Sequence, residues 1–230
     1  MFEFDLFIAA AEGKLKKVKE LLQRQDIDLN KQNQEGRGAL DLACRHGHLE
    51  IVQELLYDPR VDINLGNSRG GTPLYIACQE VHIEVVKFLL NQKSKVIDVN
   101  QGAEDNATPF FISCESGCEE ITKELLKRPE LDVNSLRNDG VSPVFMAASM
   151  GHLHIIEIVL ASDFEVQVGI QWVGITAAQM AQNRGRPEIS LLLNNYETNR
   201  METKFRLQMK LMILGWKSFF FLIIETNMKS

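Results

Sequence analysis

Apolar and small residues recur along this chain with a period of about 34 residues. Aliphatic pairs mark the period at Leu21/Leu22, Leu55/Leu56, Leu89/Leu90, Leu125/Leu126 and Val159/Leu160. A column of small residues follows in steps of 34, 34, 36, 34 and 34 residues, at Ala9, Ala43, Ala77, Ser113, Ala147 and Ala181. Self-similarity at a fixed period of this length is typical of a stacked repeat protein.

Each repeat carries the signals of two short helices. Thr72 before Pro73 is a favourable helix start, because the hydroxyl caps a backbone N–H and proline suits the first helical position. A glycine such as Gly47 ends the first helix in a left-handed conformation. The second helix, for example "HIEVVKFLL" from residue 82, places its apolar residues on one helical face. We therefore predict helix pairs within 1–30, 31–64, 65–100, 101–134, 135–167 and 168–196.

The segments "GGTPLYIACQEVHIEVVKFLL" (residues 70–90) and "GALDLACRHGHLEIVQELL" (residues 38–56) resemble ankyrin repeats. The pattern of that family is Gly-x-Thr-Pro-Leu-His-x-Ala-x-x-x-Gly-His, and the resemblance covers residues 3–196 as six repeats. It implies an all-α ankyrin-repeat solenoid of stacked helix-turn-helix units with hairpin-like finger loops. It also implies a scaffold or adaptor that binds a partner protein, without enzymatic activity and without a cofactor.

Two departures from the family pattern have physical consequences. The histidine of the Thr-Pro-Leu-His element is replaced in five repeats, by Asp41, Tyr75, Phe111, Phe145 and Gln179. Val81 stands where the other repeats have the turn glycine. A β-branched residue in a left-handed conformation is strained, so we predict that the third repeat is locally weaker.

Composition narrows the range of partners and compartments. The net charge of −6 argues against a nucleic-acid partner, because nucleic-acid binders normally carry a basic stripe. The first residues, "MFEFDLFIAAAEGKLKK", lack the positive region of a secretory signal, and the four cysteines lack paired short spacings. We expect an intracellular monomer, in the cytoplasm in preference to the nucleus.

The residue types that can catalyse reactions or bind metals fall into repeat columns, which favours a structural role. His48, His82 and His152 share one position at the start of the second helix, and Cys44, Cys78 and Cys114 share another in the first helix. Triplication is unusual for a catalytic or metal-binding residue, so we predict no metal site, no catalytic residues and a core role for the three cysteines. Cys118 is the one cysteine considered for a redox role, because it lies near a helix start, where the pKa of a thiol is lowered.

In ankyrin repeats, partners contact the finger tips and the exposed side of the first helices. By register, the resemblance assigns this role to Gln34, Glu35, Arg37, Arg45, His46, Ser68, Arg69, Gln79, Glu80, Glu104, Asp105, Glu115, Ser116, Asn138, Asp139, Val141, Ser149, Met150, Trp172, Val173, Ile175, Asn183 and Arg184. Trp172 is the strongest candidate, since tryptophan is frequent at interface hot spots.

The composition changes after Tyr196. Residues 1–196 carry 19 Lys/Arg and 28 Asp/Glu, whereas residues 197–230 carry six and three. Met201, Phe205, Met209, Met212 and Trp216 form one stripe of a predicted amphipathic helix. The apolar run 211–224 has several interpretations: a cap that docks on the end of the array, an interfacial membrane anchor, a spanning helix, or a disordered tail. Fourteen residues reach about 21 Å, which is short of the roughly 30 Å hydrocarbon core, so a spanning helix is least favoured. The alternative function is a membrane-surface protein anchored by residues 200–224.

One further expectation follows from the resemblance. Asn30, Asn64, Asn100 and Asn134 each follow an acidic and an aliphatic residue. This pattern resembles the target of an asparaginyl hydroxylase, although the same asparagine also suits a purely structural role within the finger.

Overall fold

The structure is a computed structural model that describes residues 2–214. The chain divides into two compact units, Met1–Ile112 and Ser113–Ser230. Since the boundary falls inside α7 (Pro109–Ser116), this helix contributes to both units.

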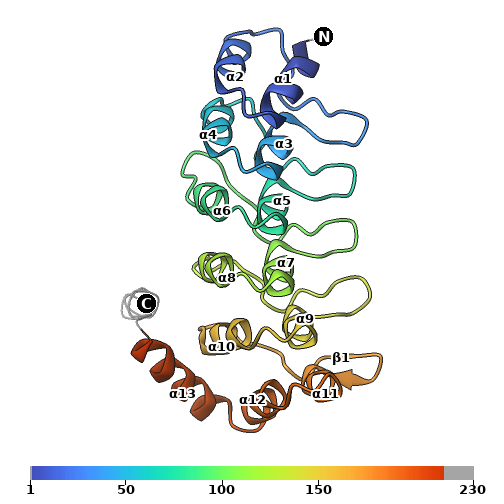
Figure 1. Cartoon of the computed structure of the whole chain (residues 1–230), viewed down its shortest axis with the longest axis vertical. Helices are drawn as coiled ribbons and strands as arrows, with labels where there is room; N and C mark the ends of the chain where they lie inside the picture. The colour runs from blue at the N-terminus through green and yellow to red at the C-terminus, as the bar shows by residue number, and fades with distance from the viewer. Residues whose placement is uncertain (1, 215–230) are drawn as a thin grey trace. The chain divides into compact units, whose positions relative to one another are not determined.

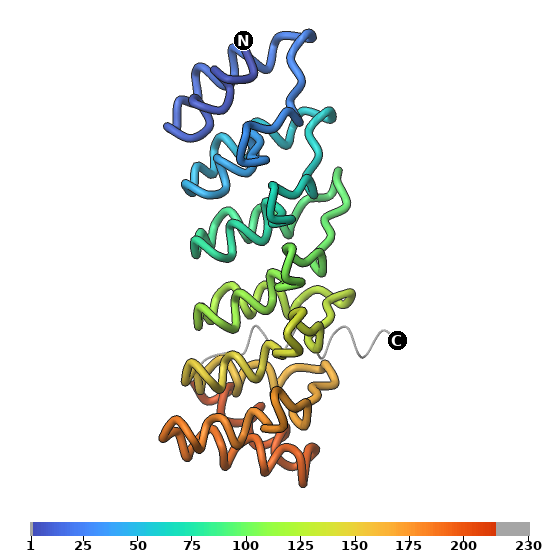
Figure 2. The backbone as a smooth tube through the Cα atoms, turned by 90° about the vertical axis from the view of Figure 1, so that its right-hand side faces the viewer, coloured from blue at the N-terminus to red at the C-terminus, as the bar shows by residue number. Residues whose placement is uncertain are grey.

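The first unit consists of three helix pairs and the beginning of α7. Its helices are α1 (Phe2–Ala11), α2 (Leu15–Leu22), α3 (Ala39–Arg45), α4 (Leu49–Tyr57), α5 (Pro73–Gln79) and α6 (Ile83–Leu90). The first helices of the pairs, α1, α3 and α5, pack on one another as an inner row, and α2, α4 and α6 form the outer row (Figure 1). The pairs lie in successive layers, as a side view of the backbone makes clear (Figure 2). Finger loops project from the inner row, away from the outer helices.

The second unit continues the same pairing and adds a final helix. Its remaining elements are α8 (Glu119–Leu125), α9 (Pro143–Met150), α10 (Leu153–Ala161), β1 (Gln171–Trp172), β2 (Ile175–Thr176), α11 (Ala177–Asn183), α12 (Pro187–Thr198) and α13 (Arg200–Ile213). The inner helix α11 packs on α9, and α13 packs on the outer helices α10 and α12. β1 and β2 form an antiparallel hairpin in which Trp172 pairs with Ile175.

The predicted helix starts are confirmed. Thr72 Oγ1 accepts a hydrogen bond from Tyr75 N at 3.2 Å, and Ser142 Oγ accepts one from Phe145 N at 3.2 Å. Each predicted range contains one helix pair, although α12 extends two residues beyond Tyr196, to Thr198. The aliphatic pairs provide the core of the outer row, where Leu55 and Leu89 are fully buried.

Val81 has the predicted backbone conformation. Its φ of +59° lies in the left-handed region, as do those of the glycines at the same position in other repeats. The Val81 side chain is 42% exposed, so its own packing compensates only part of the strain.

The final helix differs from the sequence prediction in the face that it buries. α13 buries Thr203, Leu207 and Leu211, and not the predicted stripe. Met201, Phe205 and Met209 of that stripe are exposed and Met212 is half-buried, whereas Trp216 lies outside the described residues. The sequence pattern was misleading because apolar residues occur on both sides of this helix, and only packing selects the buried side. Most of the apolar run 211–224 also lies outside the described residues.

Candidate protein-binding surfaces

The fingers of the first unit are built by asparagine-centred turns. Asn33 N donates to Arg37 O at 3.0 Å, and the Asn33 side chain accepts hydrogen bonds from the amides of Glu35 and Arg37. Asn67 forms the same arrangement in the next finger, with Gly70 in the left-handed conformation that the turn needs. These turns hold Glu35, Arg37, Ser68 and Arg69 at the tips.

Neighbouring fingers of this unit are bonded to one another. Ser68 Oγ donates to Glu35 O at 2.6 Å, and Glu104 N donates to Arg69 O at 2.6 Å. Gln32 Nε2 donates to Gly66 O nearer the base of the fingers. Because the tips are linked by main-chain acceptors, they form one ordered surface instead of independent loops.

A charged group lies beside these fingers on the inner helices. Arg45 Nη1 contacts Glu80 Oε1 at 2.8 Å, which links α3 to α5. Asp41, on the same face of α3, is only 3% exposed and accepts a hydrogen bond from Asn67 Nδ2 at 2.9 Å. Burial raises the pKa of the Asp41 carboxyl, and the Asn67 hydrogen bond and the positive charge of Arg45 oppose that shift. Asp41, at the position of the family histidine, thus bonds to the finger through Asn67.

The last finger of the second unit has an apolar tip. Trp172 packs edge-on against Phe145, with ring centroids 5.6 Å apart. Val173 is 82% exposed and has a φ of +50°, and Gly174 follows at +78°. Two successive residues with positive φ suit a tight hairpin turn, which normally selects Asn-Gly. The exposed tip thus carries a strained, branched apolar residue beside an aromatic ring that is fixed by packing.

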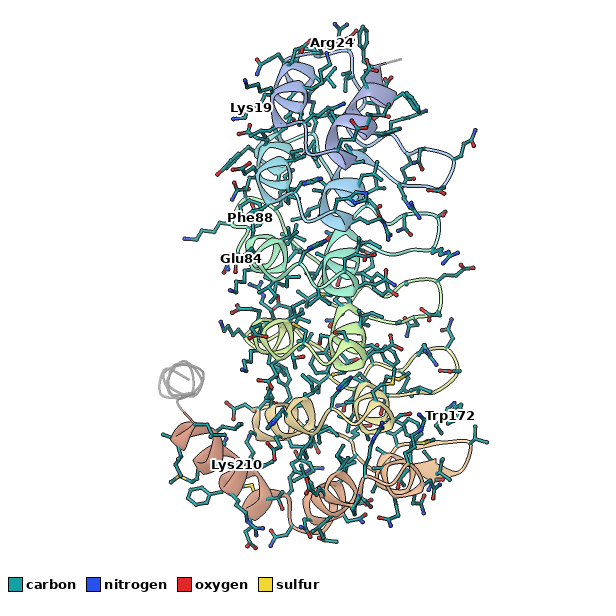
Figure 3. The ribbon with its side chains drawn as sticks, viewed as in Figure 1. Lys19, Arg24, Glu84, Phe88, Trp172 and Lys210 are labelled. Carbon is teal, nitrogen blue, oxygen red and sulfur yellow. The ribbon has the colours of Figure 1, made fainter. Side chains whose placement is uncertain are left out.

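Most sequence-predicted binding residues are at least partly exposed. Val141 and Ser149 are the exceptions, because both are buried in the second unit, which does not favour direct contact with a partner. Met150 and Arg184 are exposed at the ends of α9 and α11. Figure 3 shows Trp172 on the finger side of its unit and Lys210 on the opposite, outer side. Binding by the remaining residues stays a prediction.

The repeated histidines connect each helix pair to the preceding one. His48 Nε2 donates to Ala11 O at 3.0 Å, His82 Nε2 to Arg45 O at 2.9 Å, and His152 Nε2 to Glu115 O at 2.9 Å. Arg186 takes over this role at the last pair, where its guanidinium donates to Ala148 O. These bonds are within the two units and satisfy carbonyls at helix ends. The structural role predicted for the three histidines is confirmed.

The cysteine column is part of the core. Cys44, Cys78 and Cys114 are fully buried. Burial raises the pKa of the Cys44 and Cys114 thiols, which disfavours the reactive thiolate. Cys118 is half-buried at the N-cap of α8. Within residues 2–214, no three His, Cys, Asp or Glu side chains are grouped so that they could hold a metal ion.

The asparagines of the predicted hydroxylation pattern bridge successive fingers. Asn30 Nδ2 donates to Arg60 O at 2.8 Å, and Asn30 Oδ1 accepts from Asp62 N at 2.8 Å. Asn64 and Asn134 make equivalent bonds to the segments that follow them. Their amides therefore have a structural function whether or not they are modified.

The fold defines a class: a helical repeat protein in which finger loops project from a row of inner helices. The Ank_2 family, described as ankyrin repeats (3 copies), matches residues 6–102 and 95–171. The chain therefore belongs to the ankyrin-repeat family, whose members serve as protein-protein interaction modules.

Solved structures agree with this assignment. An ankyrin repeat domain from Acinetobacter baumannii is 22% identical, with a TM-score of 0.73, and the match covers 83% of this chain and 96% of that one. The ankyrin repeat protein EF0377 is 26% identical, with a TM-score of 0.75 and the same coverage. The third structure is the complex of the predatory endopeptidase Bd0816 from Bdellovibrio bacteriovorus with immunity protein Bd3460. One chain of this complex is 26% identical, with a TM-score of 0.70, and the match covers 83% of this chain and 96% of that one. No curated protein matches the sequence.

Among the described residues, no helix is both long and apolar enough to cross a bilayer.

Proposed function

We propose that this protein is a non-enzymatic scaffold or adaptor that binds a partner protein through its finger tips and inner helices. The observation that carries the proposal is the tip formed by Trp172 and Val173. An exposed valine with positive φ costs stability and contributes no packing in return, and backbone strain of this kind accumulates at functional sites. Trp172 is held by Phe145, so the tip offers a partner a rigid apolar anchor.

The first unit provides a separate, polar candidate surface of its own. Arg37, Arg69 and Glu80 carry charge at the tips and at the end of α5, and the bonds between fingers hold the tips in order. A protein complex among the similar structures is consistent with binding of this kind. The proposal includes an intracellular monomer, in the cytoplasm or the nucleus, that uses no cofactor.

The test is capture of partners from native extract by the full chain and by matched variants. One variant carries Arg37→Ala and Arg69→Ala, and a second carries Val173→Asn. The control carries Glu84→Ala and Lys87→Ala, an exposed ion pair on the outer helix α6. A partner retained by the control and lost by either finger variant supports the proposal. Equal capture by all three variants would place recognition elsewhere.

Two further candidate roles remain proposals. Hydroxylation at Asn30, Asn64, Asn100 or Asn134 would be detected as a mass increase of one oxygen in peptides of the protein isolated from cells, and unmodified peptides at all four positions would reject it. The second candidate is attachment to a membrane surface through residues 200–224, and the exposed face of α13 favours it.

A further inference from the structure

The final helix has two apolar faces, of which the fold uses one. Leu207 and Leu211 are buried against the outer helices of the second unit. Four other apolar residues, spaced four apart along the helix, are exposed and form what we call the outer stripe: Met201, Phe205, Met209 and Ile213. Phe205 is 64% exposed and Ile213 is 82% exposed. A soluble helix would normally carry polar residues on such a face.

Polar bonds fix α13 with the outer stripe directed outward. Lys210 Nζ contacts Glu157 Oε1 at 2.6 Å, and Glu157 on α10 is only 4% exposed. Lys204 pairs with Asp163 at 3.0 Å, and Gln208 Nε2 donates to Ala161 O at 3.0 Å. Turning the helix to bury the outer stripe would break these bonds and leave Glu157 without its lysine. The packing of this unit therefore keeps the outer stripe exposed.

The sequence beyond α13 continues the same chemistry. Leu214 is followed by Trp216 and by the run Phe219–Ile224, whose residues are aromatic or aliphatic. The segment 197–230 has six Lys/Arg against three Asp/Glu. The four basic residues of α13 pair with carboxylates, and Lys217 and Lys229 follow in the sequence, the first of them next to Trp216. Apolar and aromatic residues combined with positive charge are the features that place a helix in the interface of an anionic membrane. We propose that the outer stripe of α13 binds the surface of a lipid bilayer with anionic headgroups.

The dimensions favour a surface-bound helix. The outer stripe extends about 18 Å along α13, from Met201 to Ile213, at 1.5 Å per residue. Its four side chains offer on the order of 100 Å² each, which is less in total than the roughly 800 Å² per partner of a stable protein interface. A second copy of the chain would therefore be held weakly by this stripe. A bilayer accepts a narrow stripe, since the apolar side chains enter individually at the headgroup boundary.

The inference rests on the second candidate function and gives it its contact residues. The experiment is flotation of the full chain with vesicles of phosphatidylcholine, with and without phosphatidylserine. The test variant carries Phe205→Ser and Ile213→Ser. The matched control carries Tyr57→Ser and Val96→Ser, which replace two equally exposed apolar residues of the first unit. Light scattering during size exclusion reports the oligomeric state, and circular dichroism confirms the fold of every protein.

We expect the wild type and the control to float with phosphatidylserine vesicles, and the test variant to bind at least about tenfold more weakly. Absence of wild-type binding, or equal binding by the test variant, would overturn the proposal. A wild-type dimer that becomes monomeric in the test variant would overturn it in favour of a second copy of the chain. The Arg37→Ala, Arg69→Ala variant should float like the wild type, so failure of the lipid proposal and failure of partner binding by the fingers are distinguishable.

Discussion

The imidazole of His152 lies directly over the backbone of Gly117. A Cβ added at Gly117 would be 2.7 Å from His152 Nδ1, and His152 Nε2 donates to Glu115 O two residues before that glycine. Gly47 and His82 repeat the relationship in the first unit. Glycine is needed here both for its positive φ and for the space that the histidine ring occupies.

This double requirement predicts a graded effect of alanine substitution. Gly117 and Gly185 have nearly equal φ values, +72° and +70°, but nothing lies within 4 Å of a Cβ at Gly185. We expect Gly185→Ala to cost about 1–2 kcal/mol from backbone strain, and Gly117→Ala to cost clearly more, because the ring of His152 must also move. Urea unfolding followed by circular dichroism measures both. Equal losses would show that the contact with the ring contributes little.

Val81 should be a site of easy stabilisation. Its φ of +59° is unfavourable for a β-branched residue, and its side chain is exposed. We expect Val81→Gly to raise the free energy of unfolding by about 1 kcal/mol, because the strain that is removed exceeds the entropic cost of glycine. The melting temperature is the readout, and an unchanged or lower value would contradict the strain argument.

At Val173 we expect stability and binding to change in opposite directions. Asparagine tolerates positive φ, so Val173→Asn should stabilise the hairpin by about 1 kcal/mol. The same change removes the apolar tip and should weaken capture of the partner. Thermal melting and the pull-down are measured on the same preparation. If stability rises while capture is unaffected, the strain at this tip has no role in recognition.

Asp41 should give the stability a defined pH dependence. Burial raises the pKa of its carboxyl above the ordinary value of 3.8. Between pH 3.8 and the pKa of the folded state, the folded protein therefore keeps a proton that the unfolded protein has lost. The contribution of Asp41 to the free energy of unfolding is therefore largest below pH 3.8 and falls as the pH rises to the folded pKa. We expect the stability of the wild type relative to Asp41→Asn to decline with pH across this window and then to level off. A constant difference would mean that the buried carboxyl titrates normally.

The ion pair between Lys210 and Glu157 should stabilise the docking of α13. Lys210→Met keeps much of the aliphatic stem but removes the lysine cation from the buried Glu157, which keeps only the His154 imidazole at 3.4 Å. We expect this change to cost about 1–3 kcal/mol. Arg206→Met is the matched control, because the Arg206–Glu202 pair is exposed within the same helix and such pairs contribute little. Urea unfolding of both variants measures the two losses in the free energy of unfolding. Similar small losses would mean that apolar contacts alone stabilise the docking of α13.

The sequence by itself determined the repeat, the helix pairs and their starts. These features depend on local patterns: a hydroxyl before proline at Thr72, a glycine at the turn, and an aliphatic pair such as Leu55 and Leu56 on one face. The repeated histidines were assigned a structural role correctly because their column was visible as a period. Each of these signals either lies within a few residues of sequence or recurs at a fixed spacing.

The tertiary structure alone decided which faces are buried. Val141 and Ser149 occupy register positions of the predicted binding surface, yet packing encloses them. Met201, Phe205 and Met209 of the predicted stripe face outward because Glu157, Asp163 and Ala161 O of other elements bond the opposite side of α13. A helix with apolar residues on two sides has no preferred side in isolation. Its orientation follows from partners more than 35 residues away in the chain, and these partners are brought together only by the fold.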